Sequence, residues 1–97
     1  MSKVSLEGVL AKAVPGYLPV TVATTLLGKA LGKEYPKPEA GPFYQWKRRN
    51  DDTLHFAKFF NRWFVSWDSF VEKVKEQCRA NEVPVPPREQ LERWIDD

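Results

Sequence analysis

The stretch that decides the fold is PFYQWKRRNDDTLHFAKFFNRWFVSWDSFVEKVKEQ, residues 42–77. It opens with Pro42, which suits the first turn of a helix because the N–H that proline lacks has no partner there. Phe43 and Trp46 lie three residues apart and therefore share one helix face. A run of Asn and Asp then favours a stop and a turn. The pattern predicts a short helix over residues 42–50.

Two segments rich in aromatic and β-branched residues follow, LHFAKFF and RWFV. This composition is typical of β-strands. Asn61, between the two segments, tolerates the positive φ angle that a tight hairpin turn needs. We therefore predict a β-hairpin over residues 54–65 that turns at Phe60 and Asn61. Alternation places Lys58 on the face opposite Phe59.

A longer helix is predicted after the hairpin, with Ser66 as its N-cap and Asp68 in its first turn, where a negative charge complements the helix dipole. The helix is expected to reach about Cys78. Its buried stripe consists of Phe70, Val71 and Val74. Residues 79–87 hold three prolines, and a last short helix is expected over residues 87–95, with Leu91, Trp94 and Ile95 on one side.

The N-terminal third gives weaker patterns. Residues 4–14 have the spacing of a short amphipathic helix, and residues 21–31 form a second apolar stripe. Thr21 is the expected N-cap of the second helix, and Gly32 its C-terminal stop. Residues 32–42 contain three prolines and two glycines, and they predict a loop.

The composition is that of one ordinary globular domain of 97 residues. The single cysteine, Cys78, leaves no intrachain disulfide and no Cys/His cluster for zinc, which suits a reducing cytoplasm. The net charge of +2 is unevenly spread. Residues 29–62 carry eight basic and four acidic side chains, whereas residues 63–97 carry five basic and eight acidic ones. A polyanion would therefore dock on the middle third.

The middle of the chain resembles the excisionase and MerR-type winged-helix domains. The resemblance rests on YQWKR at residues 44–48, on LHFAKFFNRWFVSWDSFV at residues 54–71 and on VTVATTLLG at residues 20–28. The matching positions of the hairpin and the following helix are Lys58, Arg62, Trp63, Val65 and Phe70. About half of the chain is covered. It departs from the family in its long loop before residue 42 and in carrying Phe60-Asn61 where a glycine is usual.

The resemblance implies an α+β fold, mainly α: a winged helix-turn-helix with a two-stranded β-hairpin wing and extra terminal helices. It implies an N-terminal extension over residues 1–19, a DNA-binding domain over 20–78, and a proline-containing linker with a short helix packed on that domain over 79–97. The expected function is an architectural protein that binds duplex DNA and promotes excision of a phage or other mobile element. Expected partners are an integrase or recombinase and further copies of the chain.

Four residues of the short helix are candidate DNA contacts. Gln45 suits an adenine edge, and Arg48 or Arg49 a guanine or a phosphate. Lys47 is the better candidate for a phosphate. The alternative is a solvated basic face without a partner.

The hairpin supplies three further candidates. Arg62 and Asn61 at the tip suit a narrow minor groove, and Lys58 suits a phosphate. The alternative for Arg62 is a cation–π contact with Trp63 or Phe60.

No pattern favours catalysis. His55 is the only histidine, and no Gly-rich phosphate loop is present. The sequence therefore predicts a protein that is not an enzyme, with no cofactor, metal, membrane or small-molecule substrate, in the cytoplasm near the nucleoid. Two alternatives remain open: a small winged-helix transcriptional regulator, and a phage-encoded protein-interaction module or inhibitor on the same scaffold.

Overall fold

The computed structural model describes residues 12–33, 41–49 and 51–96. In these ranges the chain forms an α+β fold that is mostly helical, with four helices and a three-stranded antiparallel sheet, which confirms the expected class. The elements in chain order are β1 (Tyr17–Pro19), α2 (Val20–Leu31), α3 (Pro42–Arg48), β2 (Phe56–Phe59), β3 (Arg62–Ser66), α4 (Trp67–Ala80) and α5 (Arg88–Asp96). Most of the helix predicted over 4–14 and most of the predicted loop lie outside the described residues.

The β2–β3 hairpin turns where the sequence predicts. Phe60 and Asn61 have φ angles of 52° and 63°, and the flanking pair Phe59 and Arg62 closes a two-residue turn. Two successive positive φ angles are what a type I′ hairpin turn needs, because its twist matches that of the strands.

The predicted hairpin is present, and β1, a strand that the sequence did not predict, extends it into a three-stranded sheet. The strand order is β1-β3-β2, and β1 pairs with β3 so that Leu18 lies opposite Val65. Both side chains are fully buried. Three residues ending in a proline are too few to show an alternating pattern, so only the pairing with β3 defines this strand.

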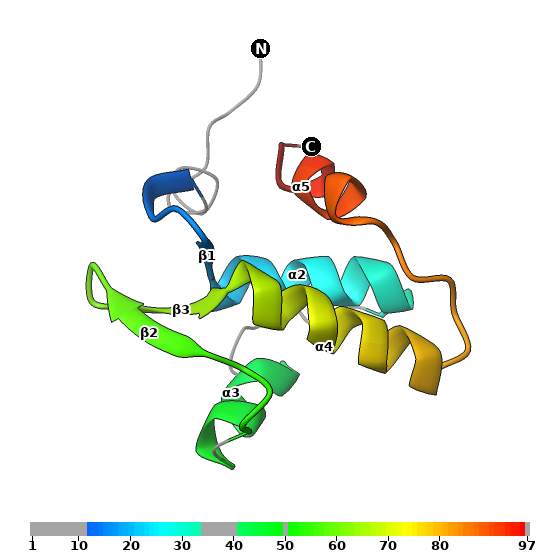
Figure 1. Cartoon of the computed structure of the whole chain (residues 1–97), viewed down its shortest axis with the longest axis horizontal. Coiled ribbons are helices and arrows are strands. Elements are labelled where there is room, and N and C mark those ends of the chain that lie inside the picture. Colours follow the sequence, from blue (N-terminus) through cyan, green and yellow to red (C-terminus); the bar gives the residue numbers. More distant parts are fainter. Residues whose placement is uncertain (1–11, 34–40, 50, 97) are drawn as a thin grey trace.

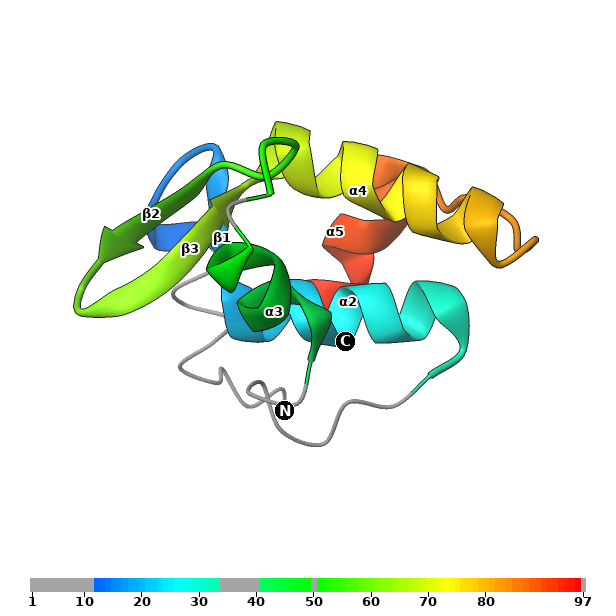
Figure 2. The same ribbon diagram turned by 90° about the horizontal axis from the view of Figure 1, so that it is seen from below.

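The helices pack beside the sheet around one core. α2 and α4 lie alongside each other, and α3 and α5 flank them on opposite sides, as the two views in Figures 1 and 2 show. The fully buried side chains from these elements include Leu26, Leu27, Phe43, Phe70, Val74 and Leu91. In the described ranges, no helix has both the length and the apolar character needed to cross a membrane.

One end of α2 differs from the sequence prediction, and the other end agrees with it. α2 begins at Val20, directly after Pro19 of β1, so the prediction of Thr21 as its N-cap is wrong. Thr21 lies inside the first turn, where its carbonyl accepts a hydrogen bond from Thr25 Oγ1. The predicted stop at Gly32 is confirmed: this residue has a φ of 70°, which glycine adopts without steric strain.

The other helices differ by small shifts at their ends. α3 ends at Arg48, before the predicted residue 50, and α4 continues to Ala80 rather than Cys78. α5 spans Arg88–Asp96. Ser66 is the N-cap of α4 as predicted, because its Oγ accepts a hydrogen bond from the Ser69 amide at 3.2 Å.

We expect Ser66→Ala to destabilise the fold by about 1 kcal/mol, because it leaves one amide of the first turn of α4 without its side-chain acceptor. Chemical denaturation followed by circular dichroism measures the loss. Ser66→Thr keeps a hydroxyl at the cap and should stay within a few tenths of a kcal/mol of the parent. Equal losses for the two variants would contradict a capping role.

Candidate nucleic-acid interface

α3 is anchored through one buried aromatic ring. An isolated helix of seven residues is not stable in water, so its contacts with the rest of the fold must hold it. Phe43 is fully buried. Its ring centroid lies 5.9 Å from that of Phe70 in α4 and 5.1 Å from that of Trp46. Truncating such a ring typically costs about 3–5 kcal/mol, enough to detach a short helix.

The face of α3 opposite Phe43 is open to solvent. Gln45, Arg48 and Arg49 are exposed there, and their spacing of three and four residues puts them on one side of the helix. Their exposure agrees with a position on the side of α3 away from Phe43. The arrangement offers one amide and two guanidinium groups on a convex surface.

A buried ion pair fixes the end of α3 to α4. Lys73 of α4 is 5% exposed, and its Nζ lies 2.9 Å from Asp51 Oδ2 and 3.5 Å from Glu76 Oε1. The same ammonium lies 4.5 Å from the centroid of the Trp46 ring. Residues on α3, on the loop after it and on α4 therefore meet around one cation.

Asp51 also shapes the turn that leads into the hairpin. Its carboxylate accepts hydrogen bonds from the amide and the hydroxyl of Thr53, and its carbonyl accepts one from the Leu54 amide at 3.2 Å. The hydrogen bond from Lys73, followed by that from the Thr53 hydroxyl, lowers the pKa of Asp51 from 3.8 to about 2, against the opposing effect of burial. The predicted helix end and turn after α3 are confirmed. The negative charge of Asp51 is balanced by Lys73.

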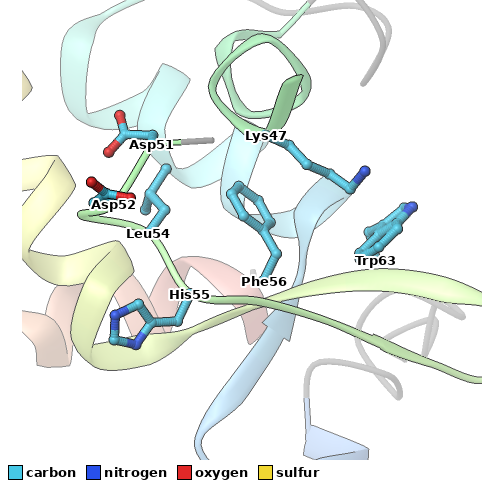
Figure 3. A pocket seen from close by; sticks show the side chains of 7 residues that line it. All are labelled: Lys47, Asp51, Asp52, Leu54, His55, Phe56 and Trp63. Atoms are coloured by element: carbon cyan, nitrogen blue, oxygen red, sulfur yellow. The ribbon is translucent and has the colours of Figure 1, made fainter. Parts of the chain in front are cut away.

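Trp63 of β3 brings two lysines together. Lys47 Nζ of α3 lies 3.8 Å from the centroid of the Trp63 ring, and Lys58 Nζ of β2 lies 5.8 Å from it. Figure 3 shows the Lys47 side chain extending from α3 toward Trp63. A cation over a tryptophan face gains about 0.5–1 kcal/mol at an exposed site. One ring thus holds a basic group from the helix and one from the hairpin in the same place.

A pocket of about 480 Å³ lies between α3 and the start of the hairpin. Its lining residues are Lys47, Asp51, Asp52, Leu54, His55, Phe56 and Trp63 (Figure 3). The positive charge of Lys47 lies at the Trp63 side, and the exposed carboxylate of Asp52 lies at the side of the loop. An anion approaching this junction is therefore attracted on the hairpin side and repelled on the loop side.

The tip of the hairpin forms a separate group. Asn61 and Arg62 are both exposed. Lys58 pairs with Trp63 and Phe59 with Arg62, so alternation along the strands sends the Arg62 side chain to the face opposite Lys58 and Trp63. The alternative of a cation–π contact between Arg62 and Trp63 is therefore wrong. Among the described residues, the cations over the Trp63 ring are Lys47 and Lys58.

The seven predicted contact residues therefore divide into three groups. The exposed face of α3 carries Gln45, Arg48 and Arg49; the Trp63 ring gathers Lys47 and Lys58; the tip carries Asn61 and Arg62. The first two groups lie on adjoining elements, whereas Arg62 leaves the sheet on the other side.

Sequence reasoning did not connect two residues with this candidate site. Trp63 was considered as a cation–π partner of Arg62 and not of Lys47 or Lys58, and Lys73 was not singled out. The signal for Lys73 is its position one turn after Phe70 and beside Val74, which places a lysine on the buried side of α4. A cation at such a position needs an acidic partner, and Asp51 is that partner.

Comparison with protein-family models, with curated proteins and with solved structures finds no match to this chain. The chemistry of the three groups of side chains is therefore the basis for proposing a function.

The lowered pKa of Asp51 predicts an acid-dependent loss of stability. The folded carboxyl has a pKa of about 2 against 3.8 as the reference value, so the charge on Asp51 stabilises the fold fully above about pH 4 and this contribution disappears as the pH falls toward 2. The shift corresponds to about 2 kcal/mol. Denaturation midpoints measured between pH 6 and pH 2 test this range.

Asp51→Asn should be less stable than the parent at neutral pH. Its stability should also change less than that of the parent as the pH falls from about 4 toward 2. Asp52→Asn, at the exposed neighbouring position, is the matched control and should keep the parental profile. An Asp51→Asn profile as steep as that of the parent below pH 4 would contradict the assignment.

Proposed function

We propose that this protein binds duplex DNA, with the exposed face of α3 in the major groove and the β2–β3 hairpin against the neighbouring backbone and minor groove. The observation that carries the proposal is the meeting of Lys47 and Lys58 on Trp63. It brings one lysine of a short helix next to one lysine of a hairpin. Two adjoining elements of this kind can grip one face of a duplex.

The size and chemistry of α3 suit a major groove. The groove of B-DNA is about 12 Å wide and admits a single helix. Gln45 can pair with adenine through two hydrogen bonds. Arg48 or Arg49 can pair with guanine in the same way or can bind a phosphate. Because Phe43 fills the core behind them, these side chains are presented on a fixed support.

The hairpin supplies contacts that position the protein. Lys47 and Lys58 are suited to neighbouring phosphates, which fix register without reading sequence. The charge of Asp51, which would repel a phosphate, is balanced by Lys73 at 2.9 Å. The pairing thus reduces the electrostatic repulsion at the junction where the backbone of the duplex would pass.

In this proposal α2 and α3 act as a helix-turn-helix and the hairpin acts as its wing. The resemblance to excisionases supports a more specific role, that of an architectural protein that bends DNA and directs an integrase or recombinase toward excision, with further copies bound alongside. An excision assay with the integrase of the same mobile element separates this role from transcriptional control. Normal excision without the protein, together with altered expression from a nearby promoter, would favour the regulator.

Arg48→Ala should weaken binding to duplex DNA and reduce its dependence on salt. Each phosphate contact contributes about 0.9 to the slope of log affinity against log salt concentration, so the loss of one contact lowers the slope by about that amount. Fluorescence anisotropy with a labelled duplex across a salt series measures both effects.

Arg79→Ala removes the same charge from an exposed position near the end of α4 remote from the hairpin (Figure 1). This control should leave the slope unchanged. Equal slopes for the parent and Arg48→Ala, or an equal fall for both variants, would rule out a phosphate contact specific to α3.

Gln45→Ala should reduce sequence preference more than general affinity. Loss of a bidentate contact to a base typically costs about 1–3 kcal/mol of discrimination, so the affinity ratio between a selected and a random duplex should fall by about 5- to 150-fold. The salt dependence should stay as in the parent, because an amide neutralises no phosphate. An unchanged ratio would mean that Gln45 does not read a base.

A further inference from the structure

The tip of the hairpin exposes an aromatic ring in an unfavourable backbone conformation. Phe60 is 66% exposed and has a φ of 52°. Glycine and asparagine adopt such angles readily, whereas a bulky side chain does so with strain. Phe60 therefore gives the fold neither a fully buried ring nor a relaxed turn. Strained positions of this kind gather at functional sites.

The ring is supported from below by other aromatic side chains. Its centroid lies 6.4 Å from that of Phe64, which lies 5.4 Å from that of Phe59. Phe59 in turn meets Tyr17 of β1 edge to face at 5.4 Å. The hairpin tip projects beyond the helices in both Figure 1 and Figure 2. An exposed ring packed on other rings at a projecting tip has the geometry of a wedge.

The surroundings of Phe60 are polar and positive. Asn61 and Arg62 follow it directly and are exposed, and Lys58 of β2 is exposed on the opposite face of the hairpin. An apolar groove on a protein would have to accommodate these cations, whereas a DNA duplex offers phosphates to them and a stacked base pair to the ring. The combination of an exposed ring with flanking cations favours a nucleic acid as the occupant.

We propose that Phe60 inserts between two adjacent base pairs from the minor groove, beside Arg62, and that it kinks the duplex. This inference rests on the proposed DNA binding and adds to it a site of insertion. Apolar side chains that enter the minor groove partly unstack a base step and bend the helix toward the major groove. Pyrimidine–purine steps unstack most easily, so they are the expected target.

The test uses the full chain and a short duplex with a single central T–A step, 2-aminopurine in place of the adenine of that step, and fluorophores at the two ends. The parent should raise the 2-aminopurine fluorescence and shorten the end-to-end distance. Phe60→Gly should do neither and should bind about tenfold more weakly, as expected for the loss of one stacking contact. Phe60→Trp should keep the kink.

Two controls separate insertion from damage to the fold. The melting temperature of Phe60→Gly should stay close to that of the parent. Glycine relieves the strain of the positive φ angle, which offsets the lost contact with Phe64. Val85→Ala shortens another exposed large hydrophobic residue, 37% exposed and located between α4 and α5. It should bind and kink DNA as the parent does.

Three outcomes would overturn the wedge. If Phe60→Gly kinks the duplex and raises the fluorescence as the parent does, the wedge is wrong while DNA binding stands. If the parent binds no duplex, both proposals are wrong. If Phe60→Gly instead abolishes self-association of the DNA-free protein and leaves the kink intact, Phe60 is a protein contact.

Discussion

The position of α3 depends on the ion pair between Lys73 and Asp51. Seven residues cannot keep a helix folded by their own hydrogen bonds, so α3 lies where its two attachments put it. Phe43 enters the core at one attachment, and Asp51 meets Lys73 at the other. Removing one partner of such a pair leaves a buried charge without compensation, which is far more harmful than the loss of a surface salt bridge. The helix that carries the proposed DNA contacts is therefore held by electrostatics as well as by packing.

The same pair organises the charge of the surface around it. Lys73 is occupied by Asp51 and Glu76, so the cations directed outward in this region are those of α3 and the hairpin. Lys47 and Lys58 both use Trp63 as a support. A flexible lysine loses less conformational entropy on binding when a ring already restricts it. In the proposed complex with DNA, Trp63 would thus restrict the two amines before a phosphate binds.

Local chemistry made part of this fold predictable from the sequence. Pro42, Ser66, Gly32 and Asn61 each mark a helix end or a turn through the properties of the residue itself, and their expected positions agree with the structure. β1 could not be predicted in this way, because a three-residue strand exists only through its pairing with β3. The start of α2 at Val20 follows from that pairing too. In the site, the exposed face of α3 followed from helical spacing, whereas the meeting of Lys47 with Trp63 depends on how α3 and the sheet pack.

The strand order β1-β3-β2 has a consequence for the path of folding. β2 and β3 are joined by a two-residue turn, and α4 follows β3 without a break, so these elements can assemble from contacts that are close in sequence. For β1 to form hydrogen bonds with β3, the whole chain segment between Leu18 and Val65 must first close into a loop. Because loop closure precedes the gain from such distant contacts, the hairpin with α4 is expected to form the nucleus, and β1 to dock late. Substitutions at Leu18 would then mainly accelerate unfolding, whereas those at Val74 would slow folding.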